Sequence, residues 1–540
     1  MGPGQGQAVN QLPLPPRPNQ PQPSTQPTQS NPQIAPAPSD PSGMSFITRQ
    51  GHTLYENGRP FRFISINVPN LFFIEDRPDA CGWVLPDPYE QHDALLTVAH
   101  MGGRVARTYT LGAGCNFHVT QPRKYNEDCF VAIDHALAIA RTVGVRLIVP
   151  LVNNYGGKDE VGGSGDALFG NYAAFAGLRG KKPSAFWTDP ELVEDFKHLI
   201  SFVLNRVNTV NGIRALQTRY GDDPIVLAWQ LGNELGGWNG PIPPTSWTLG
   251  MTVHIRSLAP NTLVLDGTMG GLKAKDKYDR QALSSPTGPD IFTNHYYYGE
   301  SDIKRLKDDS SFVAKHNKAF IVGEFGFSNT GVYGRMYEDI LRNDKVTGSL
   351  IWSLRWYLAI LSVCPSPDID FFMIFPHCRF HSMFGGFYVH SEEGGKYWSY
   401  HAPGFPSRSR GFCFEEAEVI PQIRNYALRI QGLDPRTVPY PVPQAPYLLE
   451  DIRPKCFRFR GSAWAARYVI YRGRARDELG GVEWEPNPVA TNVTDDVCSG
   501  STLWRDERAM EGVPYYYAVQ AVGVGGDCSP WSNVVGPTYV

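Results

Sequence analysis

The sequence lacks the charge excess of proteins that bind nucleic acids or anionic membranes. Its 540 residues include 50 Lys and Arg against 53 Asp and Glu, which leaves a formal net charge of -3. Its nine cysteines form no CxxC pair and no other spacing typical of metal ligands. We therefore expect no nucleic-acid partner, no membrane association and no metal ion.

The N-terminus also lacks the apolar run of a secretory signal peptide. Residues 1–43 consist mainly of Pro, Gln, Ser and Asn, without a basic start followed by an apolar stretch. Three explanations stay open: the protein remains inside the cell, its leader has been removed, or its start is wrongly assigned. So few apolar side chains cannot offset the entropy of ordering, and we expect a disordered Pro/Gln-rich segment.

Aromatic side chains, in contrast, are plentiful. With 42% hydrophobic residues, including 12 Trp, 26 Tyr and 28 Phe, the chain can build the cores of two or three domains. Most of these rings will lie in the core, but flat aromatic faces also stack on sugar rings. A neutral partner fits this composition best.

Residues 44–432 alternate apolar strand-like runs with longer amphipathic stretches, the pattern of parallel strands joined by helices. Helices are expected over residues 129–143 and, after a Thr-Asp-Pro capping pattern, over 190–207. Eight strands in this order predict an α/β fold, the (β/α)8 TIM barrel, in which the loops after the strands carry the chemistry. The eight runs are residues 62–67, 104–109, 146–153, 226–234, 263–267, 290–296, 319–324 and 349–355.

The chain changes character after a Pro-rich linker at residues 433–445. Residues 446–540 contain short strand-like runs separated by turn residues, which predicts a small C-terminal β-sandwich. The runs 466–472 and 514–522, followed by Ser-Pro-Trp-Ser-Asn at 529–533, resemble a fibronectin type III domain. Such a module can bind, space or stabilise, and the sequence does not choose among these roles.

Two glutamates follow apolar runs of the barrel region. Glu234 ends the run 226–234, and Glu324 ends the run 319–324. Cleavage of a glycosidic bond needs one carboxylic acid that protonates the leaving oxygen and one carboxylate that attacks or activates water. A single glutamate at a strand end is more often part of a salt bridge or a solvated rim, so only the pair favours catalysis.

The two glutamates belong to an ordered set of residues, which comprises Arg107, Asn233 before Glu234, His295 and Tyr297, Glu324, and Trp352. This set resembles the pattern of glycoside hydrolase family 5 over most of residues 44–432. The resemblance implies a retaining double displacement with Glu234 as acid/base and Glu324 as nucleophile. Arg107 would lower the pKa of Glu324, whose charge would in turn raise the pKa of Glu234.

The resemblance also implies roles for the other members. Asn233 would donate to the sugar 2-hydroxyl, Tyr297 would bond to Glu324, and His295 would line the site. Trp352 would form the platform under the sugar being cleaved, and Trp238 would be an outer sugar contact. Each has a structural alternative: a turn for Asn233, hydrogen bonding within the fold for His295 and Tyr297, core packing for Trp352, and a surface loop for Trp238.

Several segments resemble the β-1,4-mannanases of this family. These segments lead us to expect an endo-acting hydrolase of β-mannan, a secreted monomer without a cofactor, acting on a neutral polysaccharide. Because mannose and glucose differ at one stereocentre, a β-1,4-glucanase or another β-glycanase of the family stays open. A barrel that binds polysaccharide without cleaving it is the alternative from another class. The segments are 46–51, 61–63, 107–109, 385–388 and 397–401.

Residues 356–378 depart from the family pattern. The segment is apolar but too poorly patterned to bury itself, and it interrupts the loop between Arg355 and Arg379. Removing it with one of the two arginines restores a loop like that of the family. We hypothesise that it is a translated, unspliced intron; if it belongs to the protein, it would be a specificity loop over the cleft.

Overall fold

The computed structural model describes most of the region expected to form the barrel and most of the C-terminal part. Residues 1–43, the insertion 356–378 and Trp238 lie outside the described residues, as do the late mannanase-like segments. The described ranges are 44–73, 85–86, 88–154, 170–210, 218–237, 242–269, 278–326, 328–354, 416–450, 452–457, 459–462, 464–476, 481–493 and 504–540.

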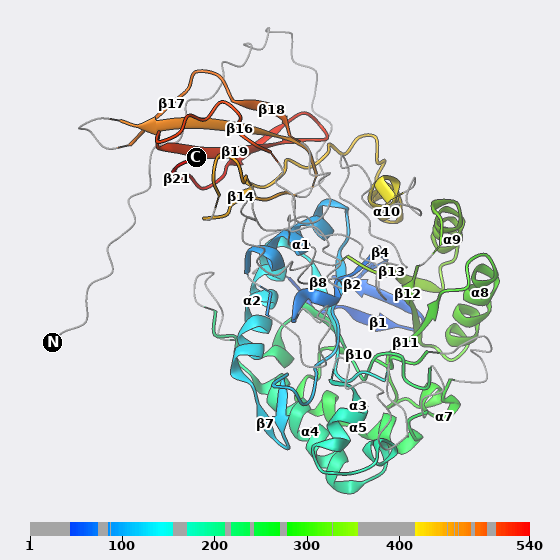
Figure 1. Ribbon diagram of the computed structural model, residues 1–540. Coiled ribbons are helices and arrows are strands. Elements are labelled where there is room, and N and C mark those ends of the chain that lie inside the picture. The colour runs from blue at the N-terminus through cyan, green and yellow to red at the C-terminus, as the bar shows by residue number, and fades with distance from the viewer. Residues whose placement is uncertain are drawn as a thin grey trace, which may run out of the picture.

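Eight parallel strands close into a barrel surrounded by helices, which confirms the predicted (β/α)8 fold (Figure 1). Each expected run overlaps one of these strands, although β12 ends one residue later and β13 begins three residues earlier than expected, and every strand is buried. Their runs are mostly apolar because both faces are covered, one by the barrel interior and one by helices. The strands are β4 (Phe63–Asn67), β5 (Val105–Arg107), β8 (Arg146–Pro150), β9 (Val226–Gln230), β10 (Leu263–Leu265), β11 (Ile291–Tyr296), β12 (Ala319–Phe325) and β13 (Val346–Ile351).

Most of the expected strand runs end later than the observed strands. Strand β9 stops at Gln230, so Glu234 lies four residues beyond it rather than at its end. Strand β13 stops at Ile351, which leaves Trp352 just outside the strand. His295 and Glu324, in contrast, both lie inside strands. Apolar patterning continued past the strand ends because the first loop residues at the barrel mouth are also buried.

The outer helices begin at the polar caps that the sequence carries. Asp189 caps α4 by accepting from the backbone N–H groups of Glu191 and Leu192, and Pro190 occupies the first helical position. Asn126 starts α2 in the same way, two residues earlier than expected. The helices include α1 (Pro88–His100), α2 (Glu127–Val143), α3 (Tyr172–Gly177), α4 (Pro190–Asn205), α5 (Thr245–Leu258), α7 (Arg280–Ser284), α8 (Ser301–Ala314), α9 (Thr330–Arg342) and α10 (Glu416–Ile430).

A small antiparallel sheet closes the N-terminal end of the barrel. Its strands are β1 (Thr48–Gln50), β2 (Thr53–Glu56) and β3 (Arg59–Pro60). Leu54 of this sheet packs with residues such as Leu227 and Ile321 inside the barrel. Glu56 pairs with Arg146 at 2.6 Å. One end of the barrel is therefore filled, and polar chemistry is left to the opposite end.

The C-terminal part contains a six-stranded antiparallel sheet and a two-stranded one. The C-terminal part is therefore rich in β-sheet, as predicted. Aromatic rings from the two sheets contact each other, as in the Phe459–Tyr468 pair. Gln444 contacts His92 of α1 at 3.1 Å, so this part lies next to the barrel helices. The strands are β14 (Tyr447–Leu448) and β15 (Phe459–Arg460), and β16 (Ala465–Ala475), β17 (Val482–Trp484), β18 (Ala490–Val493), β19 (Tyr515–Gly523), β20 (Cys528–Trp531) and β21 (Val535–Thr538).

Among the described residues, no helix is both long and apolar enough to span a lipid bilayer.

Candidate active site

The polar residues singled out in the sequence meet at the C-terminal mouth of the barrel. Arg107 ends β5, Asn233 and Glu234 follow β9, His295 lies in β11, and Glu324 lies in β12. None exposes more than 4% of its surface: Arg107 1%, Asn233 2%, Glu234 4%, His295 0% and Glu324 3%. Charged groups this deeply buried must be paired with one another or hydrogen-bonded.

Arg107 organises one side of this cluster. Its guanidinium donates to Glu324 Oε1 at 2.8 Å and to Asn233 Oδ1 at 2.7 Å. It also donates to Gln230 Oε1 at 2.7 Å and to Asn67 Oδ1 at 3.1 Å. Glu324 is the one carboxylate among these four acceptors. The positive charge of Arg107 is therefore directed at Glu324 and is not shared with a second acid.

His295 lies between the two glutamates. Its Nδ1 is 2.8 Å from Glu234 Oε1 and 3.2 Å from Glu324 Oε2. The hydroxyl of Tyr297 donates to the same Glu324 Oε2 at 2.6 Å. One atom from each of the two glutamates and the histidine all lie within 4.8 Å of one another. The two carboxyl groups are thus close enough to act on a single bond.

Burial dominates the electrostatics of this cluster. It raises the pKa of Glu324 above the ordinary value, while His295, Arg107 and the Tyr297 hydrogen bond act in the lowering direction. The expected downward influence of Arg107 is present, but the net direction is upward because the carboxylate is fully desolvated. Burial also lowers the pKa of His295 to about 4, so the imidazole is neutral near pH 7. Because Nδ1 is hydrogen-bonded to Glu234 Oε1 at 2.8 Å and lies 3.2 Å from Glu324 Oε2, we assign the proton of the neutral ring to that nitrogen.

The segment after β9 places Glu234 through unusual backbone geometry. Glu234 adopts a left-handed conformation with φ of 55°, which most side chains avoid. A Cβ on Gly232 would lie 2.8 Å from the carbonyl of Val152, so only glycine fits there. The side chain of Asn154 holds the segment by donating to the carbonyl of Glu234 at 3.0 Å and to that of Gly237 at 3.3 Å.

Asn233 continues the hydrogen-bonded row away from Arg107. Its Nδ2 donates to Asn153 Oδ1 at 3.1 Å, and Asn153 Nδ2 donates to the Tyr109 hydroxyl at 3.1 Å. The ring of Tyr109 lies 5.8 Å from that of Trp352, centroid to centroid. Among the contacts of the described residues, one of the two N–H groups of Asn233 is used in this way.

Sequence reasoning missed the amides that support Arg107 and Asn233. Asn67, Gln230 and Asn153 are each fully buried. Asn67 Nδ2 also donates to the carbonyl of Gly323 at 3.0 Å, which ties β4 to β12. A polar residue at or just beyond the C-terminal end of an otherwise apolar strand was the available signal for all three. That signal was applied to the glutamates and to Asn233 but not to these three amides.

A metal ion is poorly suited to the three ligand atoms of Glu234, His295 and Glu324. Both oxygens of Glu324 already accept hydrogen bonds, one from Arg107 and one from Tyr297. The guanidinium would also repel a cation. Among the described residues, this is the one group of His, Cys, Asp and Glu spaced for a metal.

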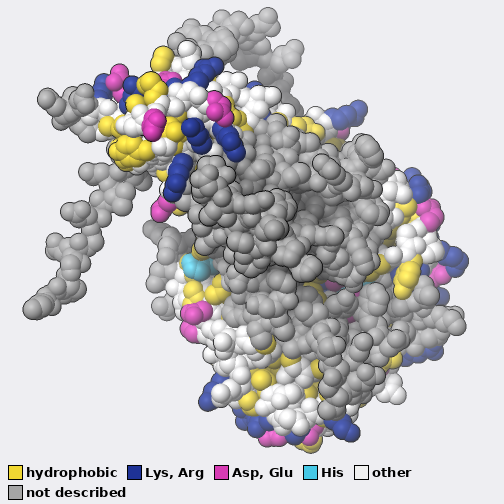
Figure 2. Space-filling model, viewed as in Figure 1, with side chains coloured by type: hydrophobic (Ala, Val, Ile, Leu, Met, Phe, Trp, Pro, Cys, Tyr) yellow, Lys and Arg dark blue, Asp and Glu magenta, His cyan; other side chains and the backbone are white. Residues whose placement is uncertain are grey.

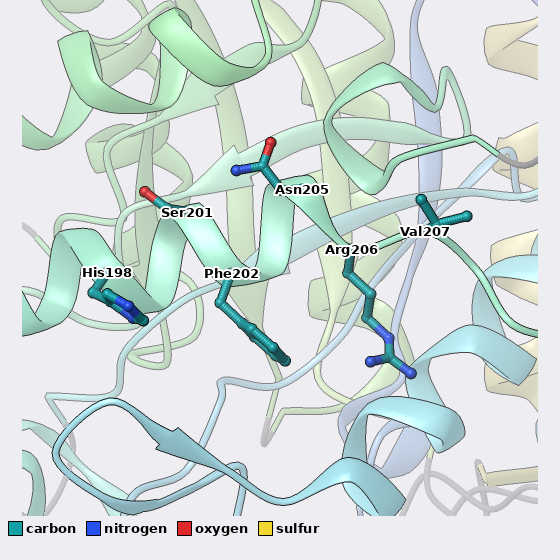
Figure 3. A pocket seen from close by; sticks show the side chains of 6 residues that line it. All are labelled: His198, Ser201, Phe202, Asn205, Arg206 and Val207. Atoms are coloured by element: carbon teal, nitrogen blue, oxygen red, sulfur yellow. The ribbon is translucent and has the colours of Figure 1, made fainter.

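A surface hollow on the outer helix α4 is separate from this cluster (Figure 3). It is lined by His198, Ser201, Phe202, Asn205, Arg206 and Val207. The guanidinium of Arg206 is already bonded to Asp134 and Glu127 at 2.7 Å each. Figure 2 shows acidic and basic side chains interspersed over the described part of one face, without a broad region of one sign. The barrel mouth therefore remains the candidate site.

Comparisons with known proteins bear on this site. A family model described as GH family 5 beta-mannosidase-like matches residues 116–321. Mannan endo-1,4-beta-mannosidase 1 of Oryza sativa subsp. japonica is 28% identical over 358 residues, covering 58% of this chain and 79% of that protein. Mannan endo-1,4-beta-mannosidase 2 of the same organism is 30% identical over 361 residues, covering 58% and 77%.

Solved structures share the fold. The glycoside hydrolase family 5 mannosidase from Rhizomucor miehei superposes with a TM-score of 0.50 at 19% identity, covering 72% of this chain and 99% of that one. An acidic pair at the mouth of a (β/α)8 barrel, together with these relatives, defines a glycoside hydrolase. The chain belongs to glycoside hydrolase family 5, because it aligns with 77% of the length of a family relative at 30% identity.

Proposed function

We propose that this protein is a retaining endo-β-1,4-mannanase in which Glu324 is the nucleophile and Glu234 the acid/base. The observation that carries the proposal is the closeness of the two glutamates, whose nearest ligand atoms lie within 4.8 Å at the barrel mouth. Retaining enzymes hold their carboxyl groups about 5–5.5 Å apart, whereas inverting enzymes need roughly 6.5–9.5 Å to admit a water molecule. The named mannanase relatives support mannan as the substrate.

The first step transfers the sugar to the enzyme. Glu234 donates its proton to the glycosidic oxygen, and the bond from that oxygen to the anomeric carbon breaks. An oxygen of Glu324 forms the new bond to the anomeric carbon and gives a glycosyl ester. Two like charges so close together are disfavoured, so a protonated Glu234 beside an ionised Glu324 is the preferred starting state.

The second step returns the enzyme to its starting state. Glu324 loses its charge when it forms the ester, so Glu234 is no longer disfavoured as a carboxylate and can take a proton from water. The water oxygen attacks the anomeric carbon, and the ester bond to Glu324 breaks, releasing the product with its original configuration. Arg107 and Tyr297 stabilise the carboxylate that leaves, through the hydrogen bonds at 2.8 and 2.6 Å.

Two further side chains are assigned to the sugar. The second N–H of Asn233 donates to the 2-hydroxyl, a contact that strengthens as positive charge develops at the anomeric carbon. Trp352 lies at the same mouth, and its ring forms part of the floor beneath the sugar at the cleavage point. These roles remain proposals alongside that of the glutamates.

The test combines product analysis with two isosteric substitutions. Wild type should release oligosaccharides from galactomannan and glucomannan but not from cellulose, and NMR should show the β-anomer first. Glu324→Gln and Glu234→Gln should each lose at least about a thousandfold in kcat, because each removes an essential reacting group. The matched control is Glu194→Gln, which removes the charge of a glutamate that pairs with Lys197 on the surface of α4.

The outcomes separate the candidate functions. Hydrolysis of cellulose but not of mannan would favour a β-glucanase. Oligosaccharide binding without hydrolysis by the wild type would identify a binding protein. An α-anomer as first product would overturn the retaining mechanism, even with both glutamates essential.

A further inference from the structure

The pairing of β11 with β12 shifts by one residue beside the two glutamates. Asn294 lies opposite Val322, but His295 lies opposite Glu324, so Gly323 is an extra residue on β12. Without this bulge, Glu324 would lie opposite Tyr296. Tyr296 points to the helical layer, where its hydroxyl donates to Asp309 of α8 at 2.8 Å. The shift therefore brings Glu324 next to His295 in the barrel mouth, since a slip of one residue reverses the face of a side chain.

Side chains bind the backbone of His295 at the bulge. Arg305 of α8 donates to the carbonyl of His295 at 2.6 Å. Asn294 Oδ1 accepts from the N–H of His295 at 2.8 Å. Asn294 Nδ2 in turn donates to Asp309 Oδ2 at 2.8 Å. Both polar backbone groups of His295 are thus held by side chains at a place where a bulge disrupts regular strand pairing.

Arg305 is itself fixed from two sides. It is 9% exposed and pairs with Asp302 at 3.0 Å, one turn earlier on α8. Its guanidinium lies over the ring of Tyr296 at 4.6 Å from the centroid. Toward the site, Arg305 bonds to the backbone of His295. We therefore expect its effect on the reaction to pass through His295.

We propose that Asn294, Arg305 and Asp309 form a latch that holds the β11–β12 bulge and thereby positions His295 and Glu324 for the reaction. The inference rests on the proposed function of the site. All three latch residues are positioning residues, and none contacts the space between the two glutamates. A misplacement of about 1 Å at a reacting group can cost about a hundredfold in rate, so a small relaxation of the bulge is sufficient to reduce kcat.

The substitution Arg305→Met removes the donor to His295 while keeping side-chain length. We expect kcat on β-mannan to fall at least about tenfold, with KM changed less than about threefold, because remote sugar contacts stay in place. Arg305→Lys keeps the charge without the planar fork and should have an intermediate kcat. Asn294→Ala acts from the other side of the bulge without removing a charge, and should lower kcat in the same way.

A matched control lies on the neighbouring helix α9. Arg335 pairs with Glu300 just before α8 at 2.6 Å, and both side chains are more than half exposed, 55% and 60%. Arg335→Met should leave kcat and KM unchanged. All variants are assayed well below their unfolding temperatures, measured by thermal denaturation, so that a fall in kcat does not reflect unfolded protein. If Arg305→Met fails to fold, Arg305→Lys and Asn294→Ala carry the test.

The outcomes are distinct from those of the proposed function. Wild type and Glu324→Gln are assayed in parallel, and loss of hydrolysis in Glu324→Gln supports the function whatever the latch variants do. If the function is supported in this way, folded latch variants whose kcat lies within about twofold of the wild-type value would overturn the latch. A rise in KM without a fall in kcat would overturn it as well, because it would indicate lost sugar binding.

Discussion

Gly323 is the residue whose substitution tests the geometry of the site most directly. It is the extra residue of the β12 bulge, and it lies against the inner face of β11. A Cβ built on Gly323 would lie 3.0 Å from His295 Nε2 and would overlap Thr293 Oγ1. Both neighbours are buried, with 1% or less of their surface exposed. A methyl group at this position must displace the imidazole, the strand or both.

The size of the effect follows from how tightly the site is packed. Overpacking a buried site costs typically about 1–3 kcal/mol of stability. If the imidazole moves by about 1 Å, its contacts with Glu234 and Glu324 at 2.8 and 3.2 Å are lost or lengthened. Such a shift corresponds to about a hundredfold loss in rate. We therefore expect Gly323→Ala to fold with reduced stability and to lose about a hundredfold in kcat on β-mannan.

The assay pairs reducing-sugar release from β-mannan with thermal denaturation. Gly250→Ala in α5 is the matched control, because a Cβ there meets no atom within 4 Å and alanine favours helix. The double substitution Gly323→Ala with Thr293→Ala removes the overlap with Oγ1 but not the close contact with His295. It should regain stability and remain slow. Full activity of Gly323→Ala would refute the reasoning that His295 must stay where the bulge places it.

Two further predictions concern charge. Arg107→Met removes a group that lowers the pKa of Glu324. Because the nucleophile must be ionised, the acidic limb of the kcat/KM profile should move to higher pH, and Arg107→Lys should move this limb less. An unmoved acidic limb in Arg107→Met would contradict the prediction. Burial raises the pKa of Asp266 to about 7 from 3.8, so the folded state binds its proton more tightly and wild-type stability should fall as pH rises between these values. The free energy of unfolding of Asp266→Asn, measured with urea, should therefore exceed that of wild type by more near pH 8 than near pH 4, with a difference of up to about 4 kcal/mol. The same difference from wild type at both pH values would show that the burial penalty is absent.

Local patterning was sufficient to predict the barrel. Eight apolar runs separated by amphipathic stretches indicate parallel strands, and each run overlaps a barrel strand. Capping residues located the start of α4, because the cap acts on backbone groups only two and three residues away. These features depend on neighbours in the chain, so the sequence alone specifies them.

Patterning placed strand ends less well because burial continues past them. Glu234 follows β9 by four residues and is still 4% exposed. Its placement depends on a left-handed backbone, on Gly232 against Val152, and on Asn154 from the neighbouring segment. No periodicity records such contacts, because each joins segments far apart in the chain.

The sequence by itself determined the barrel and singled out Glu234 and Glu324 as the candidate pair. The tertiary structure decided what surrounds them: Arg107 reaches Glu324 across 217 positions of the chain, and Gln230 reaches Arg107 across 123. It also decided the one-residue shift that turns Glu324 toward His295. The physical reason is that strand register and buried hydrogen bonds are settled only when distant strands pair and exclude water, whereas strand formation is already favoured by local pattern.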